Sequence, residues 1–184
     1  MEQAGQSRAV NSSETPTILT VGHSNQSVEH LLSLLRQHGV TVLVDVRSQP
    51  YSRFATQFNR ELLEPAVTNA NLRYLFMGEE LGGRQLGKIP SLDERLARAD
   101  EVAQSPGFQH GIDRLLDGAG RYRIAILCAE EDPTECHRRL WVGRALRAGG
   151  ATVLHIRGDG RLDADEALKR LEPPAGEQLS LFEV

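Results

Sequence analysis

The feature that most constrains this chain is the alternation of short, continuously apolar runs with longer amphipathic segments. Continuous apolar runs are typical of strands buried on both faces, and the amphipathic segments have the apolar spacing of helices. Strands and helices that alternate in this way indicate a parallel sheet covered by helices on both faces. We therefore expect a single α/β domain, built on a mainly parallel sheet of about five strands.

The expected strands are residues 17–21, 40–46, 73–77, 123–128 and 151–156. The expected helices are residues 27–39, 59–71, 91–103, 106–117, 133–148 and 163–172. Ser105, which a proline follows, is expected to cap its helix. Pro65 should kink or shorten the helix that contains it. Asp132 and Glu135 fit a capping box, which predicts a structural role for both at the start of the fifth helix.

The two ends of the chain differ from this central region. Residues 1–16 are polar and offer almost nothing to bury, so we expect a disordered tail. Residues 173–184 begin with a Pro-Pro-Ala-Gly linker and end in a short apolar peptide. The α/β domain is accordingly expected to span residues 17–172.

Composition excludes several classes of function. No apolar run approaches the roughly 18–20 residues that a membrane span needs, and the start of the chain lacks the apolar core of a signal peptide. We therefore expect a cytoplasmic protein with no membrane partner. A net charge of −4 argues against tight, unspecific binding of nucleic acid. In a cytoplasmic chain, the two cysteines are more typical of thiols or ligands than of a structural disulfide.

The residues that follow the expected strands are the main evidence for a functional site. In open parallel sheets, ligands bind beyond the carboxyl ends of the strands, which all lie at one edge. Here those positions are rich in polar and reactive side chains. The candidates are His23, Ser24, Asn25, Asp45, Arg47, Ser48, Arg53, Glu80, Gly82, Gly83, Arg84, Cys128, Glu130, Cys136, His137 and Arg138. We expect them to meet in one site.

Three interpretations of this site stay open. In the first, Cys128, Cys136, His137 and His23 bind a metal ion. Zinc accepts such ligands, although C-x7-C-H is not a standard ligand spacing. In the second, a cysteine is a nucleophile or a sulfur carrier. An exposed Cys136 would have its pKa lowered by the helix N-terminus and by His137, whereas a buried Cys136 would be a structural thiol.

The third interpretation, which we favour for binding, is a pocket for a phosphate or a nucleotide. Its binding residues would be Arg47, Arg53, Arg84 and Arg138. The candidates for proton transfer or other catalytic roles are His23, Asp45, Glu80, Cys136 and His137. The sequence names no reaction and no cofactor. It leaves open whether the chain is an enzyme or a non-catalytic module that binds nucleic acid or protein.

Four runs of the chain also resemble a known family. TVGHSNQS, LVDVRSQPYSRFATQFNR, GEELGGR and LCAEEDPTECHRR occur in the order found in the bacterial domain-of-unknown-function 488 family, over roughly residues 17–157. The resemblance implies a small single-domain α/β protein, and it implies no reaction. The loop after Gly83 lacks the aromatic-rich stretch of that family, so no ligand contacts are implied for residues 84–95. The matching candidates are His23, Ser24, Asn25, Asp45, Arg47, Ser48, Glu80, Gly82, Gly83, Cys128, Glu130, Cys136, His137 and Arg138.

The last residues predict a partner. Gln178 and Leu179 open the pentapeptide QLSLF, which Leu181 and Phe182 complete. A polar linker that presents three large apolar side chains to water predicts that something buries them. The pentapeptide resembles the peptide with which bacterial DNA polymerases and mismatch-repair proteins bind the sliding clamp. It implies a clamp partner and a role in DNA metabolism, with DNA or a nucleotide as a further ligand. The alternative is a tail that folds back onto its own domain.

Overall fold

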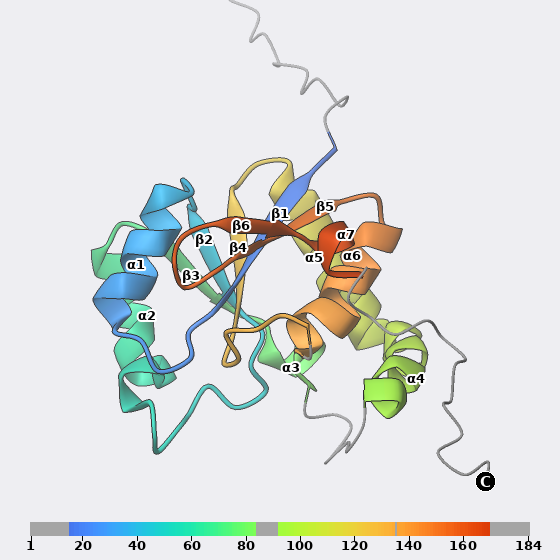
Figure 1. Ribbon diagram of the computed structural model, residues 1–184, viewed down its shortest axis with the longest axis horizontal. Coiled ribbons are helices and arrows are strands. Elements are labelled where there is room, and N and C mark those ends of the chain that lie inside the picture. Colours follow the sequence, from blue (N-terminus) through green and yellow to red (C-terminus); the bar gives the residue numbers. More distant parts are fainter. Residues whose placement is uncertain (1–14, 84–91, 135, 170–184) are drawn as a thin grey trace, which may run out of the picture.

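The structure is a computed structural model that describes residues 15–83, 92–134 and 136–169. Within these ranges, one sheet has the strand order β3-β2-β4-β1-β5-β6 (Figure 1). The strands are β1 (Thr17–Gly22), β2 (Val42–Asp45), β3 (Arg73–Phe76), β4 (Ile124–Cys128), β5 (Thr152–Ile156) and β6 (Leu162–Ala164). The first five are parallel, and β6 runs antiparallel to β5 at the edge. The predicted α/β fold with a mainly parallel sheet is confirmed.

Helices cover both faces of this sheet. They are α1 (Val28–Gln37), η1 (Thr56–Phe58), α2 (Arg60–Asn69), α3 (Gly78–Leu81), α4 (Leu92–Ala103), α5 (Pro106–Ala119), the π-helix η3 (Arg138–Gly143), α6 (Arg144–Ala148) and α7 (Asp165–Lys169). Figure 1 shows α1 and α2 on one side and α4, α5 and α6 on the other. In the described part of the chain, no helix has both the length and the apolar character needed to cross a bilayer.

The core consists of two apolar layers, one on each face of the sheet. Successive residues of a strand point to opposite faces, so Leu43 joins the layer under α1 and α2, while Val42 and Val44 join the other. All residues of β2 and β4 are buried, which explains why these strands read as continuous apolar runs. The sheet is thus a fixed platform, and its loops carry the candidate residues.

Two helix ends follow local capping rules. The side chain of Ser27 accepts a hydrogen bond from the backbone nitrogen of His30, and Ser105 accepts one from Phe108. The predicted cap at Ser105 is therefore confirmed. Helix α2 runs through Pro65, which lies inside it.

The helix predicted over residues 133–148 begins later than expected. Asp132 Oδ1 accepts hydrogen bonds from the backbone nitrogen and the hydroxyl of Thr134, at 2.9 and 2.8 Å, so it caps a turn. The backbone nitrogen of Cys136 then bonds to the carbonyl of Pro133 at 3.2 Å, and the π-helix η3 begins at Arg138. The capping-box prediction for Asp132 was wrong about the element, and Glu135 lies outside the described residues.

The helix predicted over residues 163–172 was wrong at its start. Residues Leu162–Ala164 form the edge strand β6, which pairs with Leu154–Ile156 of β5. This run has only three residues, with the polar Asp163 at its centre, and is too short to show the alternation that predicts a strand. As an edge strand, it pairs with a neighbour on one side alone. Helix α7 begins at Asp165, and residues beyond 169 lie outside the described part of the chain.

The carboxyl edge around β4 is where the chain changes direction. The chain leaves β1 and β2 towards α1 and α2 on one face, and it leaves β4 towards η3 and α6 on the other. Such a switch point is where open α/β sheets bind ligands. Backbone bonds hold the loops together: His23 donates to the carbonyl of Cys128 at 3.0 Å, and Val46 donates to that of Leu127 at 3.1 Å.

Candidate functional site

Two cysteines, a histidine and a carboxylate converge beyond the end of β4. One donor atom from each of Cys128, Glu130, Cys136 and His137 lies within 4.8 Å of every other. Glu130 Oε2 lies 2.8 Å from the Sγ atom of Cys128 and 3.1 Å from that of Cys136. The Sγ atom of Cys128 is also 3.4 Å from His137 Nδ1. We call these four residues the Cys–His cluster.

The imidazole of His137 is held in one orientation. Its Nε2 lies 3.2 Å from the carbonyl oxygen of Val46, which only accepts, so Nε2 carries the proton that it donates. In the neutral ring, the lone pair of Nδ1 then faces the two thiols. On its other side the ring packs against Gly83, where a Cβ atom would lie 3.0 Å from His137 Cγ. Of the predicted glycine pair, Gly83 therefore lies against the cluster.

The hydrogen bonds of the cluster shift the pKa of its members. Burial tends to raise the pKa of Glu130, but the bonds donated by Cys128 and Cys136 bring it down to about 2. Burial raises the pKa of Cys136 well above its ordinary value. The sequence predicted a reactive thiol only if Cys136 were exposed. Cys136 is 1% exposed, so this condition is not met. For His137, burial favours the neutral ring, but Cys136 and Glu130 raise its pKa overall.

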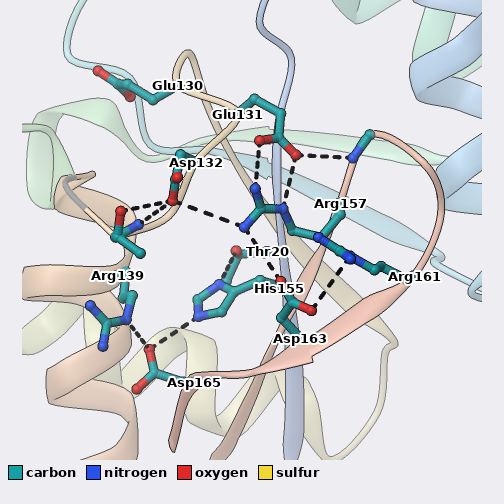
Figure 2. Close-up of polar contacts among 12 residues, drawn as sticks. Thr20, Glu130, Glu131, Asp132, Arg139, His155, Arg157, Arg161, Asp163 and Asp165 are labelled. Carbon is teal, nitrogen blue, oxygen red and sulfur yellow. Dashed lines mark hydrogen bonds and ion pairs between the residues drawn. The ribbon is translucent and has the colours of Figure 1, made fainter. Parts of the chain in front are cut away.

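The members of the Cys–His cluster differ in their exposure to solvent. Both cysteines are buried, His137 is partly buried, and Glu130 is exposed. Figure 2 shows Glu130 and Glu131 on different sides of their loop, with Glu131 turned towards Arg157 and Glu130 turned away. The carboxylate of Glu130 therefore forms the solvent side of the cluster.

A second group, next to the cluster, joins the ends of β1 and β2. Arg47 forms a two-point ion pair with Asp45, with Nε to Oδ1 at 2.9 Å and Nη2 to Oδ2 at 2.5 Å. Its Nη1 donates to His23 Nε2 at 3.1 Å, and the hydroxyl of Tyr74 donates to Asp45 Oδ2 at 2.6 Å. The ring of His23 stacks on Phe58, with the centroids 4.2 Å apart.

The charges in this second group are largely neutralised internally. His23 is 4% exposed, and burial together with the charge of Arg47 lowers its pKa to about 4, although its bond to the Ser24 carbonyl opposes this. His23 is therefore neutral at pH 7. Burial and the charge of Asp45 raise the pKa of Tyr74. Burial tends to lower the pKa of Arg47, but its hydrogen bond with Asp45 raises it overall.

The remaining candidates lie around these two groups. Ser24 and Asn25 are exposed in the loop after β1, and Ser48 lies against Gly82, where a Cβ atom would be 2.4 Å from its hydroxyl. Arg53 is exposed in the loop after β2. Arg84 lies outside the described residues. The structure thus brings together the seven candidates of the two groups and Gly83, while Ser24, Asn25 and Arg53 lie in the loops around them.

Glu80 lies on a neighbouring surface. It pairs with Arg114 at 2.6 Å and helps to line an open groove of about 380 Å³. The groove is also lined by Arg60, Glu64, Tyr74, Leu75, Phe76 and Glu79. Because Tyr74 bonds to Asp45, this groove adjoins the second group from the side of β3.

Arg138 is fully buried and is engaged by the backbone. Its guanidinium donates to the carbonyl oxygens of Glu130 and Glu131, the latter at 2.7 Å, and its Nε donates to Thr20 Oγ1 at 3.3 Å. These bonds fix the loop that carries Glu130. The observed contacts of Arg138 are thus with the protein itself, whereas the sequence favoured a phosphate contact.

Sequence reasoning missed a buried ionic network beneath this loop. Asp165 Oδ1 accepts from Arg139 Nε at 2.9 Å and lies 3.0 Å from His155 Nε2, while Thr20 Oγ1 bonds to the other ring nitrogen of His155 at 2.8 Å (Figure 2). Burial lowers the pKa of His155. No pattern in the chain signals this network, since its members come from four separate elements.

Tyr74, Phe58 and Arg157 were also missed. Tyr74 looks like an ordinary position of an expected strand, and Phe58 precedes an expected helix. Their contacts with Asp45 and His23 depend on tertiary packing. Arg157 holds Glu131 with two bonds, at 2.9 and 2.8 Å. The polar run RGDGR (157–161), which follows β5, is the sequence signal that could have found it.

Fold and site together define an α/β domain with a Cys–His cluster at the carboxyl edge of a parallel sheet. A family model, described as a domain of unknown function (DUF488), matches residues 27–144. The chain belongs to this family. The match includes both cysteines and Arg47, while His23 to Asn25 precede it. Neither a curated protein nor a solved structure matches the chain.

Proposed function

We propose that this domain binds one zinc ion through Cys128, Cys136 and His137 and uses it, together with Glu130, in a hydrolytic reaction. The single observation that carries the proposal is the convergence of these four donors within 4.8 Å. Two thiols and an imidazole are a set that zinc prefers over magnesium or calcium. His23, the fourth ligand of the sequence-based hypothesis, instead contacts Arg47, and Glu130 takes its place in the cluster.

The surroundings of His137 support metal binding. Metal-bound histidines commonly donate their second ring proton to a carbonyl or a carboxylate, which fixes the tautomer and raises the basicity of the ligand. The bond from His137 Nε2 to the Val46 carbonyl has this arrangement and leaves Nδ1 facing the thiols. Burial of both cysteines excludes competing water from the inner side of the cluster.

Glu130 supports a reactive centre over a purely structural one. Structural zinc sites are closed by four protein ligands, whereas catalytic sites keep one position for water. Bound zinc supplies a water molecule with a lowered pKa. A cluster with two cysteines, one histidine and a nearby glutamate that acts as an acid–base group is used by zinc deaminases in this way. With zinc held by the other three residues, Glu130, as the exposed member, would hold and move a proton beside the ion.

Cobalt substitution tests whether the site is open. In cobalt-loaded protein, the visible absorption should change with pH as the bound water ionises, and Glu130→Gln should keep cobalt while shifting that titration. A spectrum that stays constant across pH in both proteins contradicts an open site. It would indicate a closed structural centre with four protein ligands.

We further propose that the domain acts in DNA metabolism and is tethered to the sliding clamp by Gln178–Phe182. This proposal rests on the sequence of the pentapeptide and its linker, which lie outside the described residues. A phosphate or nucleotide pocket is supported by Arg53, an exposed arginine in the loop after β2. Arg47 and Arg138 contribute less to it, because Asp45 and backbone carbonyls occupy their guanidinium groups.

A further inference from the structure

The loop after β2 presents two aromatic rings and an arginine to solvent. Phe54 is 93% exposed and Tyr51 is 65% exposed, and the exposed Arg53 lies between them in sequence. We call Tyr51–Phe54 the aromatic loop. Figure 1 shows residues 47–55, in turquoise, along the same edge of the molecule as the loops that follow β1 and β4. Large rings so exposed commonly mark a binding surface.

This loop is held in place by its own hydrogen bonds. The backbone nitrogen of Ser52 donates to Asn59 Oδ1 at 2.7 Å, and the hydroxyl of Ser52 accepts from the backbone nitrogens of Phe54 and Ala55 at 3.1 and 3.2 Å. Asn59 and Ala55 are buried, so they anchor the loop to the domain. The outward position of Phe54 is therefore built into the loop, and a ligand would meet a preorganised ring.

The size and chemistry of the surface favour one kind of partner. A protein interface of ordinary size involves about 20–30 residues on each side, far more than this loop offers. Aromatic rings separated by an arginine match unpaired bases joined by phosphates, because rings stack on bases and the guanidinium binds phosphate. In a duplex the faces of the bases are covered by their neighbours. The surface thus fits a single strand better than a double helix.

We propose that the aromatic loop binds single-stranded nucleic acid, with bases stacked on Phe54 and Tyr51 and a phosphate on Arg53. The segment that leads to the aromatic loop starts after Val46, whose carbonyl bonds to His137 of the Cys–His cluster. The aromatic loop follows on the same edge of the molecule as that cluster, so a bound strand lies on the edge that carries the proposed zinc centre, although binding itself does not need the metal. The net charge of −4 predicts that stacking, more than charge, supplies the affinity.

The test is fluorescence anisotropy with a labelled oligothymidine of twelve nucleotides and the full chain. Phe54→Ala should weaken binding about 5- to 150-fold, the range for loss of one base–aromatic stack. Phe54→Tyr should restore it. The matched control is Tyr122→Ala, which removes a partly exposed aromatic ring just before β4, at the opposite end of the sheet. That variant should bind like the wild type.

Three further arms make the result decisive. A duplex of the same length should bind more weakly than the single strand. The affinity should fall with salt at a slope of about −0.7 for the one phosphate that Arg53 neutralises. Binding should persist in chelator-treated protein, which separates this surface from the zinc proposal. No binding by the wild type, equal binding by Phe54→Ala, or equal binding of duplex and single strand would overturn the inference.

Discussion

Gly22 is the residue on which the geometry of the site depends most directly. A Cβ atom at this position would lie 1.7 Å from the carbonyl oxygen of Glu130, a backbone atom that no side-chain rotation can move. The absence of a side chain lets the loops after β1 and β4 approach closely enough for His23 to bond to Cys128. Glycine is required here for space, since its backbone angles are those of an ordinary strand.

We therefore predict that Gly22→Ala lowers the free energy of unfolding by about 3 kcal/mol or more, because it forces the two loops apart. Gly107→Ala is the matched control. A Cβ atom at Gly107 meets nothing within 4 Å, and alanine favours a helix, so this change should be neutral or stabilising by up to about 1 kcal/mol. Urea unfolding of the two variants measures both effects. Equal stabilities would contradict the close approach at Gly22.

His23 gives a prediction for the pH dependence of stability. Its pKa is about 4 in the folded chain, below the value of 6.5 expected when unfolded. Between these values the unfolded chain binds more protons, so stability rises with pH and is lost as the pH falls from 6.5 towards 4. The loss assigned to this one residue amounts to roughly 3 kcal/mol at most.

Unfolding of the wild type and of His23→Asn should be compared at several pH values between 7 and 4. The variant is expected to be less stable at pH 7 but to lose less stability on acidification, since it lacks the group that titrates. The carboxylates are present in both proteins, so the difference between the two curves reports on His23 and its contacts with charged neighbours. Parallel curves would show that His23 is not the neutral, buried group described above.

At the scale of elements, η3 fixes the loop after β4 through Arg138. Its guanidinium bonds to two carbonyl groups of this loop and to Thr20 on β1, and it is fully buried. A π-helix places successive side chains differently from an α-helix, and all six residues of η3 are buried. The π-helix thus buries two successive arginines, Arg138 and Arg139, beneath the site.

We predict that Arg138→Met lowers the free energy of unfolding by about 3 kcal/mol or more, because two carbonyl groups of the loop and Thr20 lose the buried guanidinium that joins them. Arg144→Ala, one turn further on, removes an exposed arginine that pairs with Asp100 and should cost less than about 1 kcal/mol. Chemical denaturation of the two variants and the wild type measures both losses in the free energy of unfolding. If Arg138→Met were as stable as the wild type, Arg138 would be available for a ligand, as the sequence suggested.

The elements also show how far sequence reasoning reaches. Strands β1, β2 and β4 were predictable because each is a continuous apolar run buried on both faces. Of the candidates that follow the strands, Cys128, Glu130, Cys136 and His137 lie together, and His23, Asp45 and Arg47 form a second group. The edge strand β6 was not predictable, because it is short and polar. The sequence alone could not show that Glu130, and not His23, joins the two cysteines and His137. The direction of these side chains depends on how the loops pack against one another.

At the scale of the whole molecule, zinc should couple to folding. The cluster joins the end of β4 to the turn before η3, so a bound ion would link two segments that the unfolded chain does not hold together. A ligand that binds the folded state alone stabilises it by about 2.7 kcal/mol at a hundredfold excess over its Kd. Chelation should therefore lower the melting temperature of the wild type.

Differential scanning calorimetry with and without a chelator measures this coupling, and Cys128→Ser serves as control. That variant should melt at the same temperature in both conditions, at or below the chelated wild type. A wild type that is insensitive to chelator, after it has been shown to contain zinc, would mean that the ion does not stabilise the fold.

The C-terminal pentapeptide gives a separate prediction for the full chain. Removal of residues 178–184 should abolish binding to the bacterial sliding clamp in titration calorimetry, because it deletes the glutamine and all three apolar anchors. Replacement of Leu181 and Phe182 by alanine should have the same effect while it leaves the α/β domain intact. Unchanged affinity in the truncated chain would discard the tether.

The central claim is that Cys128, Cys136 and His137 hold a metal ion. Native mass spectrometry combined with elemental analysis of protein purified without added ligand tests it most directly. We predict one zinc ion per chain in the wild type, and none in Cys128→Ser or Cys136→Ser. A wild-type chain that stays metal-free after incubation with zinc, while both thiols react readily with an alkylating reagent, would contradict the claim.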